Sequence, residues 1–139
     1  MLKHFIPILV FISSFGFAQN SNLTVSISGI KNNTGSLTAE LYNTKEKFLK
    51  TSYKTISSAI KSNSATVTFT EIPKGEYTVL VYHDENKNGK LDKNFIGMPK
   101  EPVACSNNAK GFMGPPKYED AKFTVTTDTK INIKMTAAH

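Results

Sequence analysis

The stretch at residues 82–92, YHDENKNGKLD, carries an oxygen-bearing group at every second position. A hard cation such as Ca²⁺ takes about six to eight oxygen ligands, and an EF-hand loop supplies them from alternate positions of a tight coil. The matching residues here are Asp84, Asn86, Asn88, Lys90 through its carbonyl, and Asp92. Gly89 falls at the sixth position, where such a loop turns sharply. The spacing therefore predicts a calcium-binding loop.

The loop departs from an EF-hand at its twelfth position, where Phe95 replaces the bidentate glutamate, and no helices flank it. Further ligands would have to come from the same long connection. The candidates are Asn94, Glu101, Glu119 and Asp120. With Asp84 and Asp92 as the only certain carboxylates, we expect weak binding, with a dissociation constant of about 0.1–1 mM.

A metal-free interpretation of the same loop remains open. Asp84, Asn86 and Asn88 are residue types that hydrogen-bond their own backbone in turns without any cation. The two interpretations differ in one respect, because a metal-free turn does not respond to a chelator.

A second segment, SNNAKGFMGPPKYEDA at residues 106–121, combines amides, glycines, prolines and aromatic rings. Amides direct hydrogen bonds and rings stack, so this composition suits a polar ligand such as a glycan or a peptide. The candidate ligand-binding residues are Asn107, Asn108, Phe112 and Tyr118. In the alternative interpretation, the prolines and glycines shape a rigid cover, and Phe112 and Tyr118 fill the edge of the core.

Other reactive residues lack the spacing that catalysis or transition-metal binding needs. His83, Cys105 and His139 form no close pair of the CxxC or HxxxH kind. The chain has no GxSxG motif, and Cys105 has no recognisable base beside it. Because Cys105 is the sole cysteine, no disulfide forms within the chain. We expect a small, partly buried and inert residue, with a reactive thiol or a bridge to another chain as the alternative. The sequence predicts no enzyme.

The N-terminus has the features of a secretory signal peptide. A short head with Lys3 precedes the apolar run FIPILVFISSFGF, and Gly16 and Ala18 are small residues at the positions that a signal peptidase inspects. The run is shorter than the roughly 20 residues of a membrane span. We therefore predict a signal peptide over residues 1–18 and one exported domain over residues 19–139. The domain would be periplasmic or extracellular, with no membrane insertion after cleavage.

The charge of the chain argues against nucleic-acid binding. The 17 basic residues are all lysines, spread singly along the chain, against 11 acids, for a net charge of +6. Reading bases and clamping phosphates favours the rigid donor fork of arginine, which this sequence lacks. No nucleic-acid partner is expected.

Short alternating segments predict an all-β fold. Apolar residues recur at every second position in residues 23–30, 36–42, 65–70, 122–126 and 130–135, whereas residues 76–82 are apolar on both faces, as in a central strand. Residues 45–50 and 118–121 could each form a single helical turn. We predict an antiparallel β-sandwich of about seven strands, transthyretin-like or immunoglobulin-like. Residues 84–120 would form one long ordered loop, because apolar residues such as Leu91 and Phe95 recur within it.

Two runs of the sequence, YHDENKNGKLDKNFIGMPKEP and SNNAKGFMGPPKYEDAKFTV, resemble a family of small exported bacterial proteins known as domain of unknown function number 2141. More loosely, TFTEIPKGEYTVLVYHDENKNGKLD is similar to transthyretin-like repeats of bacterial surface adhesins, in which a calcium loop stiffens the module without doing chemistry. Asn88 stands where those repeats carry an aspartate, which removes one charge. The resemblance implies a sandwich with a structural cation.

The sequence thus predicts a non-catalytic, exported binding or adhesion module with a calcium-pinned loop. Its partner would be a glycan, a peptide or a cell-surface protein. One alternative is a periplasmic carrier with a closed apolar cavity between the sheets. Another is a hydrolase in which His83 acts with Asp84 or Glu119.

Overall fold

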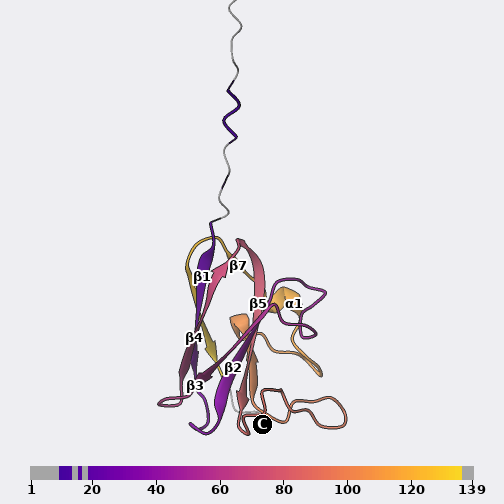
Figure 1. Cartoon of the computed structure of the whole chain (residues 1–139). Coiled ribbons are helices and arrows are strands. Elements are labelled where there is room, and N and C mark those ends of the chain that lie inside the picture. Colours follow the sequence, from indigo (N-terminus) through magenta and orange to yellow (C-terminus); the bar gives the residue numbers. More distant parts are fainter. Residues whose placement is uncertain (1–9, 14–15, 17–18, 136–139) are drawn as a thin grey trace, which may run out of the picture.

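The computed structural model describes residues 10–13, 16 and 19–135. It has eight strands, a 3-10 turn and one short helix (Figure 1). The strands are β1 (Ser21–Ser28), β2 (Ser36–Tyr42), β3 (Lys54–Ala59), β4 (Ala65–Ile72), β5 (Gly75–Asp84), β6 (Val103–Cys105), β7 (Phe123–Val125) and β8 (Thr129–Lys134); η1 is Ser106–Asn108 and α1 is Tyr118–Ala121. The predicted signal peptide, residues 1–18, lies mostly outside the described residues. Within the described part, no helix is long and apolar enough to span a membrane.

The strands form two sheets, which confirms the predicted β-sandwich. The smaller sheet has the order β4-β1-β8, and the larger has the order β3-β2-β5-β6, with β7 also paired to β5. The prediction of a purely antiparallel arrangement is wrong at one place, since β1 and β8 are parallel. The reason is that β8 follows β7 of the other sheet and is not joined to β1 by a hairpin. The Asn22 N–H donates to Asp128 Oδ1 at 2.8 Å where the chain enters β8.

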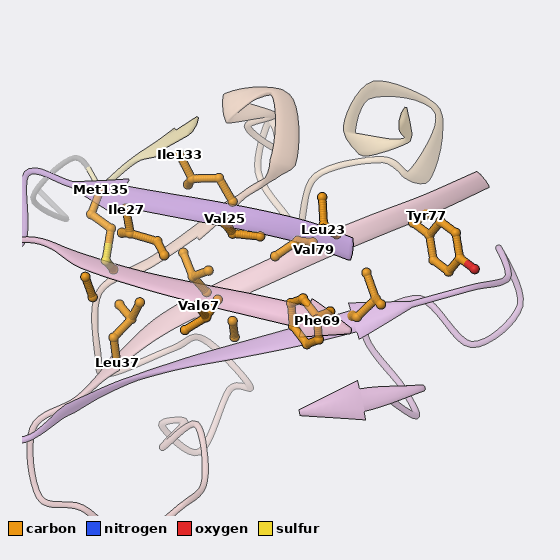
Figure 2. Close-up of a cluster of buried hydrophobic side chains, with 14 of the residues drawn as sticks. Leu23, Val25, Ile27, Leu37, Val67, Phe69, Tyr77, Val79, Ile133 and Met135 are labelled. Atoms are coloured by element: carbon orange, nitrogen blue, oxygen red, sulfur yellow. The ribbon is translucent and has the colours of Figure 1, made fainter. Parts of the chain in front are cut away.

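Alternation along the strands puts one apolar face of each sheet into a common core. On β1, Leu23, Val25 and Ile27 are buried while the residues between them are more exposed, and β4 repeats the pattern with Val67 and Phe69. These side chains meet those of the larger sheet between the two layers (Figure 2). The period of two in the sequence therefore identified the inward face correctly.

The central strand β5 is buried on both faces from Tyr77 to Asp84, as predicted. A buried backbone must satisfy its hydrogen-bonding groups along both edges. Strand β2 covers one edge, from Thr78 to Asp84. The other edge is shared by two short strands, because β7 pairs with Gly75–Tyr77 and β6 pairs with Leu80–Tyr82.

A buried serine fills the gap between β6 and β7. The Val79 N–H donates to Ser106 Oγ at 3.0 Å, and the Ser106 hydroxyl donates to the Ala121 carbonyl at 2.6 Å. One side chain thus joins β5 to η1 and to the end of α1. The segment after β6 is held against the sheet at this point.

A second apolar cluster covers the opposite face of the larger sheet. It consists of Tyr42, Phe48, Leu80, Cys105 and Ala121. The Phe48 ring lies edge-on to Tyr42, with centroids 5.7 Å apart, and to Tyr118, with centroids 5.8 Å apart. Burial raises the pKa of the Cys105 thiol to about 12, so the thiol stays protonated at neutral pH.

The sequence missed two strands, β3 and β6. The polar strand β3 lies at a sheet edge, where Ile56 is the only aliphatic residue larger than alanine and burial is partial. Strand β6 has three residues and lies inside the connection that we predicted as a loop. The single helical turn expected at residues 118–121 is confirmed as α1, whereas residues 45–50 form turns rather than a helix.

Replacing Ser106 by alanine would leave the Val79 N–H and the Ala121 carbonyl buried without their partner. We expect Ser106→Ala to lower the free energy of unfolding by about 2–4 kcal/mol, measured by urea denaturation. The control is Ser28→Ala at an exposed position of β1, which should change stability by less than about 0.5 kcal/mol. Equal effects of the two substitutions would show that Ser106 is not needed to complete the edge of β5.

Candidate metal-binding loop

The loop that follows β5 begins and ends at two facing carboxylates. Strands β5 and β6 are antiparallel, with Tyr82 opposite Val103, and the His83 N–H donates to the Pro102 carbonyl at 3.0 Å. The same register places Asp84 opposite Glu101. Residues facing each other in this way have Cβ atoms about 4.5–5.5 Å apart. Residues 85–100 therefore form the loop that connects the two strands of this β-hairpin.

The Asp84 carboxylate organises the first half of this loop. Asp84 is only 1% exposed. Its Oδ1 accepts the Asn88 N–H at 3.2 Å, and its Oδ2 accepts the Gly89 N–H at 2.8 Å. Gly89 has a φ of +74°, in the left-handed region that favours glycine. The predicted sharp turn therefore lies directly over Asp84.

Two amides hold Asp92 over the same turn. Asn88 Nδ2 donates to Asp92 Oδ1 at 2.7 Å, and Asn86 Nδ2 donates to Asp92 Oδ2 at 2.8 Å. These two hydrogen bonds, the one from Asn88 first, lower the pKa of Asp92. The amide oxygens meanwhile accept backbone N–H groups, from Asn88 to Asn86 and from Lys90 to Asn88. Asp84, Asn86, Asn88, Lys90 and Asp92 thus form one hydrogen-bonded unit.

Glu101 completes a group of three acids. It is buried, and its Oε2 accepts the Asp92 N–H at 3.3 Å. Burial raises the pKa of Glu101, and the negative charges of Asp92 and Asp84 raise it further. Asp92 and Glu101 also line a shallow polar pocket with Glu85, Asn86, Lys93 and Lys100. The structure therefore gathers the five predicted loop residues and one of the four additional candidates.

The unit is not a preformed metal cage. Among the described residues, no three His, Cys, Asp or Glu side chains lie close enough to hold a metal ion by themselves. A cation here would also need amide and carbonyl oxygens, which Asn86, Asn88 and the Lys90 carbonyl could supply. Because an asparagine carries an oxygen and a nitrogen on one planar group, a half-turn of its amide exchanges donor for acceptor.

The other three additional candidates lie apart from this unit. Asn94 Oδ1 accepts the N–H groups of Ile96 and Met98 in a turn farther along the loop. Glu119 and Asp120 belong to α1, where Glu119 pairs with Lys122 at 2.8 Å and Lys45 at 3.3 Å.

The helix α1 lies beside the opposite end of β5. The Tyr118 hydroxyl donates to Glu76 Oε1 at 2.8 Å. Glu76 and Asp84 are separated along the strand by about 26 Å, at roughly 3.3 Å per residue. Glu119 and Asp120 therefore cannot complete a ligand shell around Asp84.

The candidate ligand-binding residues are largely engaged within the protein. Asn107 Nδ2 donates to the carbonyls of Asp120 and Lys122, and Asn108 Oδ1 accepts the Lys134 N–H at 2.9 Å. Both asparagines have positive φ, which this residue type tolerates. Tyr118 packs on Phe48, whereas Phe112 is 93% exposed. The two asparagines thus use polar atoms that a ligand would need to hold η1 against the end of α1 and against β8.

His83, the base of the hydrolase alternative, is fully buried. Its Nε2 lies 2.5 Å from the Thr34 carbonyl, and its Nδ1 has no hydrogen-bond partner and lies 3.8 Å from Glu85 Oε1. Because neighbouring strand residues point to opposite faces, His83 points away from Asp84. The imidazole is therefore out of reach of a substrate in solvent.

Sequence reasoning missed the contribution of Gly35 to the site. Gly35 has a φ of +75°, and a Cβ at this position would lie 2.2 Å from the Asp84 carbonyl oxygen and 2.7 Å from Glu85 Cα. The turn before β2 therefore packs directly on the start of the loop. Residues 32–35, NNTG, are typical of a turn, but nothing in them indicates which residues the turn contacts.

The two-sheet sandwich and the amide-rich loop define a small all-β domain in which one hairpin, β5–β6, has a long loop. The chain belongs to the bacterial family described as "Uncharacterized protein conserved in bacteria", domain of unknown function number 2141, whose model matches residues 25–134. This match confirms the resemblance to that family. No curated protein and no solved structure matches the chain. The looser similarity to transthyretin-like adhesin repeats stays a prediction.

Two glycines allow a matched test of the contact between Gly35 and the loop. Gly89→Ala places a Cβ in open space at positive φ, so we expect a loss of about 1–2 kcal/mol from backbone strain alone. Gly35→Ala adds a clash with backbone atoms and should cost clearly more, measured by urea denaturation. Equal losses would mean that the Gly35 turn does not press on Asp84.

Because the pKa of Glu101 is raised, we expect Glu101 to lower the free energy of unfolding at neutral pH when no metal is present. An acid whose pKa is raised by folding contributes stability at low pH that is lost as the pH rises through the raised pKa. With chelator present, Glu101→Gln should therefore be more stable than the unmodified protein at about pH 7, and this advantage should vanish near pH 3.5. Thermal melts across this pH range measure the difference. Glu46→Gln, at an exposed position, is the control; the prediction fails if Glu101→Gln behaves like it.

Proposed function

We propose that this protein is a non-catalytic, exported binding module whose β5–β6 loop is fixed by a weakly held calcium ion. The observation that carries the proposal is that hydrogen bonds link three acids at the base of the loop: Asp84 and Asp92 both bind Asn88, and Glu101 accepts the Asp92 N–H. Within the described residues, none of the three forms a salt bridge. Like charges that face each other across a strand pair are destabilising, and a divalent cation would offset them.

The ligand set follows from residues that the fold already brings together. Asp84, Asn86, Asn88, the Lys90 carbonyl and Asp92 match the alternating EF-hand positions. Glu101 takes the place of the missing twelfth-position glutamate, because it reaches the loop from across the hairpin and not from farther along the coil. Asn86 and Asn88 would turn their amides to present oxygen. That rearrangement, together with the small number of carboxylates, agrees with weak affinity.

In this proposal the cation does no chemistry. It reduces the conformational freedom of residues 85–100, so that a partner binding there meets a preorganised surface. The buried His83 and the protonated Cys105 support a non-catalytic role. Export rests on the predicted signal peptide.

The carrier alternative finds less support. The space between the sheets is filled by the side chains of the main core. A pocket of about 180 Å³ lies beside β6, lined by its three residues and by Asn108, Ala109, Lys110 and Lys134. Small-molecule sites usually measure about 300–1,000 Å³, so this pocket is too small for a typical ligand.

Thermal unfolding of residues 19–139, which include every described strand, tests the metal. At about 10 mM calcium we expect the midpoint to rise by about 4–10 °C above its value in chelator, and equal magnesium should have a smaller effect. Asp84→Asn and Asp92→Asn each remove a negative charge with little change in shape, and both should abolish the rise. Asp128→Asn, at the entry to β8, is the control and should keep it.

An unchanged midpoint at every calcium concentration would contradict the proposal. The loop would then be a hydrogen-bonded turn without a metal.

A further inference from the structure

A small hairpin projects from the candidate metal-binding loop. The Lys100 N–H donates to the Asp92 carbonyl at 2.8 Å, and the Asn94 N–H donates to the Met98 carbonyl at 2.8 Å. Asn94 closes the turn through its side chain. We call residues 92–100 the apolar hairpin. It is ordered by its own hydrogen bonds and extends away from the sheets at the end of the sandwich where β5 ends (Figure 1).

The tip of the apolar hairpin consists of exposed hydrophobic residues. Phe95 is 100% exposed, Ile96 65% and Met98 59%. None of the three belongs to either core cluster of the described residues. Large apolar side chains grouped together in solvent point to a binding surface. A stable protein interface, however, uses about 20–30 residues on each side, and this narrow tip offers far fewer.

Lysines lie on both arms of the apolar hairpin and in the segment before it. Lys93 and Lys100 flank the tip on the two arms of the hairpin, and Lys87 and Lys90 precede it, all four exposed. Apolar side chains with lysines beside them are typical of segments that rest in the interface of an anionic bilayer. The aliphatic stems of lysine lie along the apolar layer while the ammonium groups stay among the lipid headgroups. The charge around the tip thus complements an anionic lipid surface.

The formal charge of the whole loop depends on a bound cation. Residues 84–101 contain four lysines, at 87, 90, 93 and 100, and four acids, at 84, 85, 92 and 101, so their charges cancel. A bound Ca²⁺ would change this balance to +2. Asp92 begins the apolar hairpin and Glu101 directly follows it, so the same ion would also stiffen the hairpin.

We propose that the apolar hairpin docks this protein peripherally on an anionic phospholipid bilayer. Phe95, Ile96 and Met98 enter the interface between headgroups and acyl chains, and the lysines lie among the phosphates. Docking strengthens when the loop binds calcium, and this dependence rests on the proposed function.

Vesicle co-sedimentation tests the docking. Residues 19–139 are used because the apolar N-terminal segment would itself associate with lipid. In about 1 mM calcium, the protein should sediment with vesicles containing phosphatidylglycerol and not with pure phosphatidylcholine vesicles. The double substitution Phe95→Ser and Ile96→Ser should weaken partitioning by at least about tenfold. Lys93→Gln with Lys100→Gln should weaken it by about fivefold for each lysine.

A second exposed apolar pair provides a matched control. Phe112 and Met113 are each 93% exposed but lie between η1 and α1. Phe112→Ser with Met113→Ser should leave vesicle binding unchanged. The inference is overturned if the unmodified protein does not bind the anionic vesicles, or if the two double variants lose binding equally.

The experiments can contradict the calcium site and the membrane docking independently. A calcium-dependent rise in thermal midpoint without vesicle binding would overturn the docking and leave the proposed metal loop intact. Vesicle binding that requires Phe95 and Ile96 but ignores chelator would support the docking and contradict the calcium dependence. Both measurements use the same protein, residues 19–139.

Discussion

Strand β5 is buried from Tyr77 to Asp84, and the need to pair its backbone along both edges governs the rest of this structure. On the edge away from β2 no single long strand is available, so two three-residue strands and one serine hydroxyl share the task. Strand β6 and Ser106 come from the connection after β5, and β7 follows it. That connection therefore returns over the sheet, where Ala121 is part of the second apolar cluster and Tyr118 packs against it. The connection is ordered because it supplies hydrogen bonds that this edge of β5 would otherwise lack.

The same return of the chain creates the candidate site. Once β6 is in register with β5, Asp84 and Glu101 must face each other, and the residues between them form a loop closed at its base. An EF-hand obtains its last carboxylate from farther along one coil. Here Glu101 comes from the other strand of the hairpin, and Phe95 stands at the position where an EF-hand has glutamate.

The fold was predictable where burial leaves a period in the sequence. The alternation of Leu23, Val25 and Ile27 indicates an inward face, and the apolar residues on both faces of β5 indicate a central strand. Strand β3 has no comparable signal, since an edge strand buries little, and β6 is too short to show a period. The positions of Asp84 to Asp92 followed from local spacing. The place of Glu101 depended on the strand register, and the use of the Asn107 and Asn108 amides depended on where β8 and α1 would lie.

The parallel pairing of β1 with β8 has a mechanical consequence. These strands are the first and last of the domain, and six residue pairs join them from Leu23–Thr129 to Ser28–Lys134. Because they run in the same direction, the chain enters at one end of this ladder and leaves at the other. Tension between the two termini would therefore act in shear on all of these residue pairs at once. An antiparallel pair pulled from one end would instead separate one residue pair at a time. For a domain tethered at both ends, resistance to force would then depend on the rate of this concerted rupture.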